Sequence, residues 1–257
     1  MKRLLALALL APVVALASTA FDGNWMMKLD SIKISGKPDV FALTNGSYSC
    51  TSCAPSFSVT ADGTDQAVTG RAYADHVAVK VIDKSTVEIT QKLAGKMTND
   101  AVLTASADGS KLMVKFTNNT GEKSMTGAYS EKRVAAGAAG SHAISGSWMQ
   151  DSLSDMSDFA RLNVIKSTDN GIQITWNGQM VDAKFDGKRY AWSNDAGKTT
   201  SSFKKLSDSE IEEYDHRLGK LTDVSTWTVS ADGKTITLVD FDKLHGTKST
   251  QVLEKQP

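Results

Sequence analysis

The chain has 257 residues, of which 40% are hydrophobic and 23% are charged, and this composition is typical of a globular protein. It contains 29 Lys and Arg residues and 29 Asp and Glu residues, so its formal net charge is zero. Binding to nucleic acid requires a basic surface. Residues 21–134 carry 13 basic and 12 acidic side chains, and residues 144–257 carry 14 and 17. We therefore expect no nucleic-acid partner.

The chain begins with a pattern typical of a secretory signal peptide. A short basic start precedes an apolar run from Leu4 to Ala17, which is shorter than the roughly 20 residues that span a bilayer. Small residues allow cleavage after Ala17 or after Ala20, and no cysteine stands nearby to accept a lipid. We expect residues 1–20 to be removed. The mature chain, which has no later membrane anchor, is then periplasmic or secreted.

The rest of the chain is a repeat of two units. Residues 57–109 and residues 181–233, related by a shift of 124, match at 15 of 53 positions without a gap. The stretches DGNWM, which begins at Asp22, and SGSWM, which begins at Ser145, extend the match to the start of each unit. A repeat that is present only twice indicates tandem domains and not a solenoid. We predict one domain at residues 21–134, a linker of small residues at 135–143 and a second domain at 144–257.

Both units show the alternation of apolar and polar residues that marks half-buried β-strands, for example at residues 77–81 and 172–176. Asp-Gly pairs, which are typical of hairpin turns, occur at 62–63, 108–109, 186–187 and 232–233. A sheet of about eight strands with few helices must close on itself to cover its edges. We predict an all-β fold with two tandem antiparallel β-barrels of about eight strands each.

Cys50 and Cys53 are the only cysteines of the chain. In an exported protein a disulfide is their expected state. A redox pair would stand at the start of a helix, and nothing helical follows these residues. Haem attachment would require His at the position of Ala54. We predict a structural disulfide that shapes a loop, with redox chemistry and metal binding as the alternatives.

Side chains suited to catalysis or metal binding are scattered. The histidines do not have the spacing of a zinc site, and no phosphate loop, nucleophile elbow or dinucleotide glycine pattern is present. Residues 211–217, IEEYDHR, gather four titratable groups, but alternate residues of a strand face opposite sides. We interpret them as a solvated, charged strand face. We predict no metal, no cofactor and no enzymatic activity, although an enzyme whose groups meet only in the folded chain is an alternative.

Trp25 and Trp148 each stand two residues after a glycine, at the opening of the first strand of their unit. This pattern resembles the G-x-W motif of the lipocalin and calycin barrels. The stretches TNGSYSCTSC, ADGTDQAVTG, VAVKVIDKSTVE and HAISGSW also resemble secreted bacterial lipocalin-like proteins of uncharacterised function. The resemblance implies that each Trp plugs the closed end of a barrel and that an Arg of the last strand packs over it. Arg133 matches that Arg in the first unit, whereas Gln256 does not match it in the second.

The aromatic residues are divided unevenly, since four of the five Trp lie in the second unit. Trp and Tyr combine a large apolar area with one polar group, which suits the wall of a cavity. We therefore predict that the second barrel binds a ligand. The candidate ligand-binding residues are Trp148, Trp176, Tyr190, Trp192, Phe203 and Trp227. The alternative is a filled core in which these side chains only pack.

These features together predict an exported, non-enzymatic binding protein that holds a small hydrophobic molecule in a β-barrel cavity. The alternative is a protein-interaction module of the cell envelope with filled barrels and an envelope or secreted protein as its partner. Bacterial inhibitors of secreted metalloproteases are similar barrels with G-x-W and a disulfide. An open cavity favours the first interpretation, and two packed cores favour the second.

Overall fold

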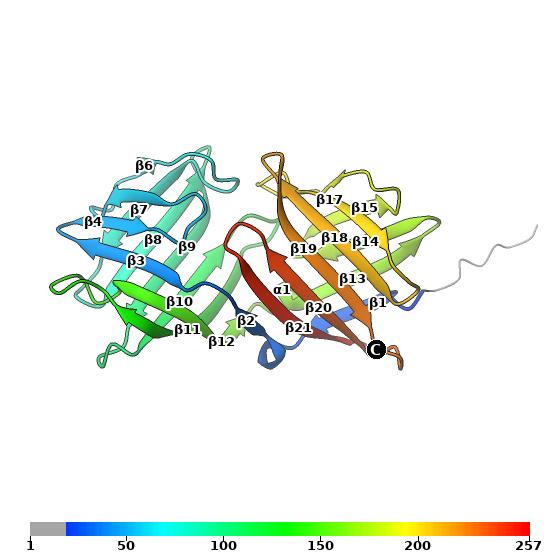
Figure 1. Ribbon diagram of the computed structural model, residues 1–257. Coiled ribbons are helices and arrows are strands. Elements are labelled where there is room, and N and C mark those ends of the chain that lie inside the picture. The colour runs from blue at the N-terminus through cyan, green and yellow to red at the C-terminus, as the bar shows by residue number, and fades with distance from the viewer. Residues whose placement is uncertain (1–18) are drawn as a thin grey trace, which may run out of the picture.

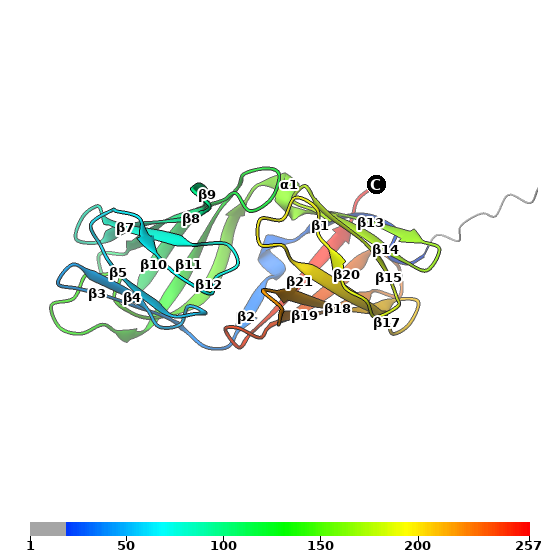
Figure 2. The same cartoon turned by 90° about the horizontal axis from the view of Figure 1, so that it is seen from above.

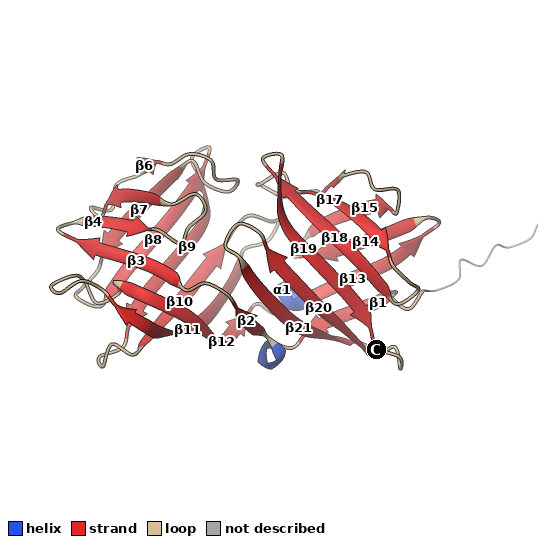
Figure 3. Cartoon of the chain, viewed as in Figure 1, coloured by secondary structure: helices blue, strands red, loops and turns tan. Residues whose placement is uncertain are grey.

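The two halves of the molecule are antiparallel barrels that lie side by side (Figure 1 and, from above, Figure 2). The computed structural model describes residues 19–257, which are almost entirely strands and loops (Figure 3). The predicted all-β fold with two barrels is confirmed. The sheets have ten and eleven strands, however, and not about eight. The additional strands, such as β6 (Gln66–Ala67) and β16 (Tyr190–Ala191), are too short to show an alternation in the sequence.

The first barrel is a ten-stranded sheet built from one continuous stretch of the chain. Its strands follow the spatial order β5-β4-β3-β12-β11-β10-β9-β8-β7-β6. Their bounds are β3 (Asp39–Thr44), β4 (Ser47–Cys50), β5 (Phe57–Thr60), β6 (Gln66–Ala67), β7 (His76–Val81), β8 (Thr86–Leu93), β9 (Lys96–Ala105), β10 (Lys111–Asn118), β11 (Met125–Ala136) and β12 (Gly146–Met156). The side-chain amide of Gln66 makes two hydrogen bonds to the backbone of Thr60: its Oε1 accepts from Thr60 N, and its Nε2 donates to Thr60 O. These bonds join the edge strands β5 and β6.

The second barrel takes its strands from both ends of the described chain. The spatial order is β15-β14-β13-β1-β21-β20-β19-β18-β17-β16, and β2 also pairs with β21. The bounds of its elements are β1 (Gly23–Met27), η1 (Leu29–Ser31), β2 (Lys33–Ser35), α1 (Asp158–Arg161), β13 (Leu162–Thr168), β14 (Gly171–Trp176), β15 (Gln179–Lys184), β16 (Tyr190–Ala191), β17 (Thr200–Lys205), β18 (Glu210–Arg217), β19 (Lys220–Val229), β20 (Thr235–Asp242) and β21 (Thr247–Lys255). A bond from Ser193 N to Met180 O, 2.8 Å long, links the edge strand β15 to the segment after β16.

The two units of the repeat exchange their first strands. β1, which carries Trp25, pairs with β13 and β21 of the second barrel, and β12, which carries Trp148, pairs with β3 and β11 of the first. Figure 1 shows the blue strands β1 and β2 beside the red strand β21. The sheets therefore divide the chain differently from the repeat units 21–134 and 144–257. The segment 135–143, which we predicted to link two domains, comprises the last two residues of β11 and most of the connection to β12 of the same barrel.

Trp25 and Trp148 are fully buried, each in the core of the barrel to which its strand belongs. The indole Nε1 of each donates to a backbone carbonyl four residues earlier, on Phe21 and on Ile144, at 2.8 Å in both cases. The glycine before each Trp is required by the backbone. Gly146 has φ +141°, and a Cβ there would lie 2.5 Å from a backbone oxygen of β11. The two G-x-W motifs thus play the same structural part in the two barrels.

A cation covers each of the two tryptophan rings. The Arg133 guanidinium lies 3.9 Å from the ring centroid of Trp148, and Lys255 Nζ lies 5.0 Å from that of Trp25. The resemblance to lipocalins implied that Arg133 covers the Trp of its own unit and left the second unit without a cation at Gln256. Because the strands are exchanged, Arg133 instead covers the Trp of the other unit. Lys255, one residue before Gln256, occupies the corresponding place in the second barrel.

Cys50 and Cys53 are joined by a disulfide at the end of β4, as the sequence predicted. Cys50 is fully buried in the core of the first barrel, so the bond anchors the loop that follows β4 to that core. The predicted signal peptide, residues 1–20, lies outside the described residues except for its last two positions. Neither helix within residues 19–257 is long and apolar enough to span a bilayer.

Candidate functional site

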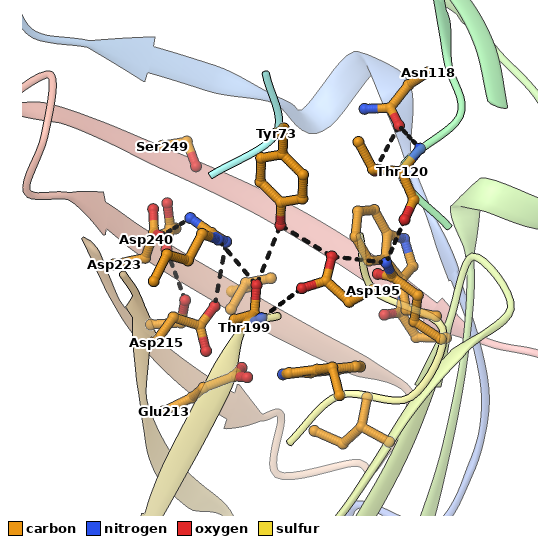
Figure 4. A pocket seen from close by; sticks show the side chains of 18 of the residues that line it. Tyr73, Asn118, Thr120, Asp195, Thr199, Glu213, Asp215, Asp223, Asp240 and Ser249 are labelled. Carbon is orange, nitrogen blue, oxygen red and sulfur yellow. Dashed lines mark hydrogen bonds and ion pairs between the residues drawn. The ribbon is translucent and has the colours of Figure 1, made fainter. Parts of the chain in front are cut away.

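The interior of the second barrel opens into a cavity of about 560 Å³, which lies toward the first barrel (Figure 4). Its walls are side chains of β1, β13–β15 and β18–β21, and residues of the first barrel complete it on the remaining side. This volume falls within the range of roughly 300–1,000 Å³ that is usual for small-molecule sites. The cavity is therefore large enough for one small ligand.

Three tryptophans form much of the apolar wall, and the NH group of each indole is already hydrogen-bonded. Trp176 Nε1 donates to a backbone carbonyl of α1 at 2.7 Å, Trp192 Nε1 to Ser201 Oγ at 2.6 Å, and Trp227 Nε1 to Glu213 Oε2 at 3.1 Å. These bonds hold the rings in place. What the rings offer to a ligand is therefore their apolar faces and their π electrons.

Four carboxyl groups project into the same cavity from three neighbouring strands. Glu213 and Asp215 lie two residues apart on β18, Asp223 lies on β19 and Asp240 lies on β20. Successive side chains of a strand alternate between its two faces, so residues two apart share one face. Figure 4 shows Glu213, Asp215, Asp223 and Asp240 gathered on one side of the cavity. The second barrel thus has an acidic wall beside its tryptophan wall.

Burial makes ionisation of these carboxyl groups unfavourable. Desolvation raises the pKa of Glu213 well above its usual value, and the charge of Asp215 adds to the effect. The pKa of Asp215 is also raised by burial, although Ser201 and a neighbouring guanidinium oppose the shift. Burial raises the pKa of Asp240 to about 6, with the nearby aspartates contributing. Any ligand that places positive charge here would favour the ionised forms.

Arg217 is the guanidinium that neutralises part of this acidic wall. Its Nη1 lies 2.6 Å from Asp223 Oδ2, and its Nη2 lies 3.8 Å from Asp215 Oδ2. Its Nε donates to Thr199 Oγ1 at 3.0 Å, which ties β18 to the loop at the mouth of the barrel. Both aspartates next to Arg217 are therefore compensated from within the protein.

The mouth of the cavity is covered by Tyr73 of the first barrel. The Tyr73 hydroxyl donates to Asp195 Oδ1 at 3.1 Å and lies 3.1 Å from Thr199 Oγ1, as Figure 4 shows. Its ring packs on Gly197, where a Cβ atom would come within 2.3 Å of a ring carbon. A residue with a side chain at position 197 would displace this ring. Residues of both barrels thus line the cavity, which stays partly open to solvent.

The corresponding positions of the first barrel show which of these groups the fold itself requires. The shift of 124 that relates the repeat also relates the strand registers of β8–β10 to those of β18–β20. Ile89 then corresponds to Glu213, and Phe116 corresponds to Asp240. The same barrel geometry therefore accommodates apolar side chains at these positions, and the carboxyl groups are a property of the second barrel alone.

Three of the six residues that we predicted to bind a ligand line this cavity. They are Trp176, Trp192 and Trp227, and they come from β14, the segment after β16, and β19. Periodicity alone predicts that Trp176 shares a face with Ile172 and Ile174 of its strand. The structure adds that all three rings reach one space.

The other three predicted residues lie elsewhere. Trp148 belongs to the core of the first barrel, because the exchange of strands places β12 there. Phe203 is 1% exposed within the core of the second barrel. Tyr190 packs against that core, and its hydroxyl donates to Asp186 Oδ2 at 3.0 Å. None of the three is among the residues that line the cavity.

The acidic wall is the part of the site that the sequence analysis missed. It predicted a solvated strand face for residues 211–217, and that prediction is wrong for one side of β18. Glu213, Asp215 and Arg217 share the inner side, and Glu213 is only 5% exposed. A comparison of the two units could have indicated the acidic wall, because Glu213 stands at the position where the first unit has the apolar residue Ile89. Without a structure, however, the inward side of the strand could not be identified.

The site contains aromatic faces and hydrogen-bond acceptors, an arrangement suited to binding. Within residues 19–257, no group of three or more His, Cys, Asp and Glu side chains is placed to hold a metal ion. No protein-family model matches this chain, and no curated protein and no solved structure is significantly similar to it. The resemblance to lipocalin-like proteins therefore stays a prediction, and the function must be argued from the cavity.

Proposed function

We propose that this protein is an exported, non-enzymatic binding protein that holds one small organic molecule in the cavity of the second barrel. The observation that carries the proposal is the cavity itself, with a volume of about 560 Å³, three tryptophans in its wall and a cover supplied by the other barrel. A barrel that served only as a scaffold would fill this space with side chains, because protein interiors are close-packed. The basic and apolar start of the chain and the disulfide support export.

The wall of the cavity suggests a ligand with an apolar body and a polar end. Met27, Ile174 and Leu238 join the three indole rings in the apolar part of the wall. The carboxyl groups lie on one side of the same space. A purely hydrophobic ligand, which the sequence alone suggested, would leave buried carboxyl groups without a partner. An amphipathic ligand satisfies both parts of the wall.

The first test is native mass spectrometry of the full chain, expressed with its own N-terminal segment, exported to a bacterial periplasm and purified without detergent. We expect a population of protein with a discrete additional mass that is lost on denaturation. A bare polypeptide mass, together with no binding in a titration with small amphipathic molecules, would contradict the proposal. It would favour the alternative, a protein-interaction module.

Substitutions in the tryptophan wall test where the ligand lies. Trp192→Leu and Trp227→Leu keep apolar volume but remove the indole faces, so we expect each to weaken binding about tenfold or more, given the contribution of aromatic burial. Phe241→Leu is the matched control, because Phe241 lies on β20 beside Asp240 but is 38% exposed on the outside. Equal affinities in the wild type and both tryptophan variants would place the ligand elsewhere.

A further inference from the structure

We infer that the ligand of this cavity is a small organic cation, an amine or a guanidine with an aromatic or aliphatic body, whose charged end lies between Glu213 and Asp240. This inference rests on the proposed function and names the class of its ligand. It is carried by the balance of charge in the wall, by an acceptor that has no donor, by the comparison of the two barrels and by the tryptophan faces.

The wall of the cavity has more carboxyl groups than cations. Five carboxyl groups and two guanidinium groups line it. Arg217 is paired with Asp223 and Asp215. Arg71, the other cation, donates to a backbone carbonyl of the first barrel and lies over the ring of Phe57, 5.1 Å from its centroid. Within residues 19–257, two of these acidic side chains are therefore compensated and no further cation pairs with the others.

Asp195 is satisfied by neutral donors at the mouth of the barrel. It accepts from the Thr199 backbone at 2.6 Å, and from Tyr73 and Gln179 at 3.1 Å. Glu213 and Asp240 also have hydrogen-bond partners within the protein, and for Glu213 these include Asp215 and Ser201. Among the described residues neither belongs to an ion pair, and the donors closest to them are Trp227 Nε1, at 3.1 Å from Glu213, and Ser225 Oγ, at 2.7 Å from Asp240. Glu213, which is buried, and Asp240, which is partly buried, are thus the carboxyl groups of the wall that pair with no cation among the described residues.

Asn99, on the side of the cavity formed by the first barrel, gives a second and independent indication. Its side-chain oxygen is buried and accepts no hydrogen bond from any described residue. Buried acceptors almost always have a donor, because leaving one unpaired costs stability. The indole donors of the cavity are already engaged with the protein. A ligand that complements this cavity therefore brings a hydrogen-bond donor, which an ammonium or guanidinium group supplies.

The first barrel shows that the carboxyl groups are not needed for folding. Ile89 and Phe116 occupy the positions that correspond to Glu213 and Asp240, and the strands pair there in the same register. A buried carboxyl group without a cation destabilises a protein, whereas an apolar side chain of similar size does not. The second barrel thus retains two unfavourable groups in a position where a cationic ligand would offset their cost.

The tryptophan wall fits the same class of ligand. A cation near the face of an indole ring is attracted by the π electrons, and Trp is the strongest aromatic partner in this respect. Trp192 and Trp227 stand beside the acidic wall, and the volume of about 560 Å³ has room for a ring or a short chain in addition to the charged end. The carboxyl groups, the unpaired acceptor of Asn99 and the aromatic faces therefore all favour a small organic cation as the ligand.

The test compares three probes that share one skeleton: phenethylamine, 2-phenylethanol and phenylacetate. Isothermal titration of the full mature protein at pH 7.5 measures the affinity of each. We expect the amine to bind at least about tenfold more tightly than the alcohol, in line with a charge-assisted hydrogen bond, and the acid to bind most weakly. Equal affinities for amine and alcohol, or tighter binding of the acid, would overturn the cation inference and leave the proposed function intact.

Variants in which an amide replaces a carboxyl group of the same shape test which carboxyl groups bind the cationic end of the ligand. Glu213→Gln and Asp240→Asn keep the shape of the site and its acceptor oxygens, so both should fold. We expect each to reduce the affinity for phenethylamine about tenfold and to leave 2-phenylethanol nearly unchanged. Glu131→Gln is the control, because Glu131 is a buried carboxyl of the first barrel outside this cavity. Unchanged amine affinity in both cavity variants would overturn the assignment.

The pH dependence of binding gives a readout that a purely structural role would not affect. Because the pKa of Asp240 is about 6, the amine should bind more weakly at pH 5 than at pH 7.5. The charged groups around Asp240 are Asp223 on β19, Asp215 and Glu213 on β18 and Asp242 on β20 itself, and Arg217 pairs with the first two of these aspartates. Asp240→Asn should reduce this difference, while Glu131→Gln should not. An amine affinity that is the same at both pH values in the wild type would contradict the role of Asp240.

The mass of the molecule that co-purifies with the exported protein separates the remaining outcomes. If no probe binds but that molecule is an amine or a guanidine, the cation inference holds for a different body. If the molecule is neutral or acidic, the inference is overturned while the binding function stands. If no probe binds and the polypeptide carries no additional mass, the proposed function itself fails.

Discussion

Glu131 is an ionisable side chain at a core position of the first barrel. It pairs with Leu112 across β10 and β11, and the corresponding residue of the second barrel is Leu253, which pairs with Ile236. Glu131 is 1% exposed, and among the described residues its Oε2 has no hydrogen-bond partner. Burial raises its pKa to about 8, and the carboxyl of Asp39 adds to the shift. At neutral pH Glu131 is therefore mostly protonated in the folded protein.

This raised pKa makes the stability of the protein depend on pH. The folded state holds the proton of Glu131 more tightly than the unfolded chain, in which Glu titrates at about 4.3. Its favourable contribution is complete below that value and is lost as the pH rises toward and through about 8. We expect Glu131→Gln, which stays neutral, to be more stable than the wild type by an amount that grows from on the order of 1 kcal/mol at pH 5 to on the order of 4 kcal/mol at pH 8.

Urea unfolding of the two proteins at several pH values from 5 to 9 measures this difference. The other buried carboxyl groups are present in both proteins, so their contributions to the pH dependence cancel when one free energy of unfolding is subtracted from the other. Parallel curves for the wild type and Glu131→Gln across this range would show that Glu131 is not protonated in the folded state.

At the scale of the elements, the partners of β1 and β12 follow the chemistry of the facing residues. In the second barrel, Met27 of β1 faces Leu253 of β21, and in the first barrel Gln150 of β12 faces Glu131 of β11. Without the exchange, Met27 would face Glu131 and Gln150 would face Leu253. The exchanged arrangement pairs apolar with apolar and polar with polar, which lowers the cost of burying the carboxyl group.

The exchange predicts which fragments of the chain fold. A fragment of residues 33–157 contains all strands of the first barrel, including Trp148, and we expect it to unfold cooperatively on heating. A fragment of residues 144–257 lacks β1 and Trp25, whose loss from a core costs about 3–5 kcal/mol in the analogous case of Trp→Ala. We therefore expect the second fragment to fold poorly.

Circular dichroism and thermal denaturation of the two fragments measure this prediction. Addition of a synthetic peptide of residues 19–32 should restore cooperative unfolding to the fragment 144–257, because the peptide supplies β1. If that fragment unfolds as cooperatively as the fragment 33–157 without the peptide, β12 is able to replace β1 and the exchange is not required.

At the scale of the whole molecule, the two barrels depend on each other at the mouth of the cavity. Tyr73 and Gly197 occupy corresponding positions of the two units under the shift of 124, and they meet as a ring against a glycine. The carbonyl of Thr120 in the first barrel accepts from the Ala196 backbone at 3.0 Å and from Gln179 Nε2 at 3.3 Å. Divergence of the two units thus produced complementary surfaces at their contact.

Removal of Tyr73 should open the cavity. Tyr73→Ala removes the ring and two hydroxyl contacts, and we expect it to lower the free energy of unfolding by about 1–3 kcal/mol. It should also increase acrylamide quenching of the tryptophan fluorescence. Trp25 and Trp148 are 0% exposed, so this increase would report on the three tryptophans of the cavity. Tyr73→Phe keeps the ring and should give a smaller change. Quenching equal to that of the wild type in Tyr73→Ala would show that Tyr73 does not close the cavity.

Features that depend on local chemistry were predictable from the sequence. Alternation within strands and Asp-Gly turns indicated an all-β chain, the repeat indicated two barrels, and Cys50 and Cys53 indicated a disulfide, because each signal lies within a few neighbouring residues. The uneven distribution of Trp pointed to the second barrel for the same reason. These signals do not depend on which strand finally lies beside which.

The choice of strand partners and the composition of the acidic wall were decided only by the tertiary structure. β1 and β12 both begin with the pattern G-x-W-M, so the motif alone could not show that each belongs to the barrel of the other unit. Likewise, β18 carries charged residues on both faces, and alternation alone does not say which face is turned inward. Glu213 and Asp240 come together because separate strands close into one barrel. Tyr73 reaches Asp195 and Thr199 because the first barrel lies beside the mouth of the second.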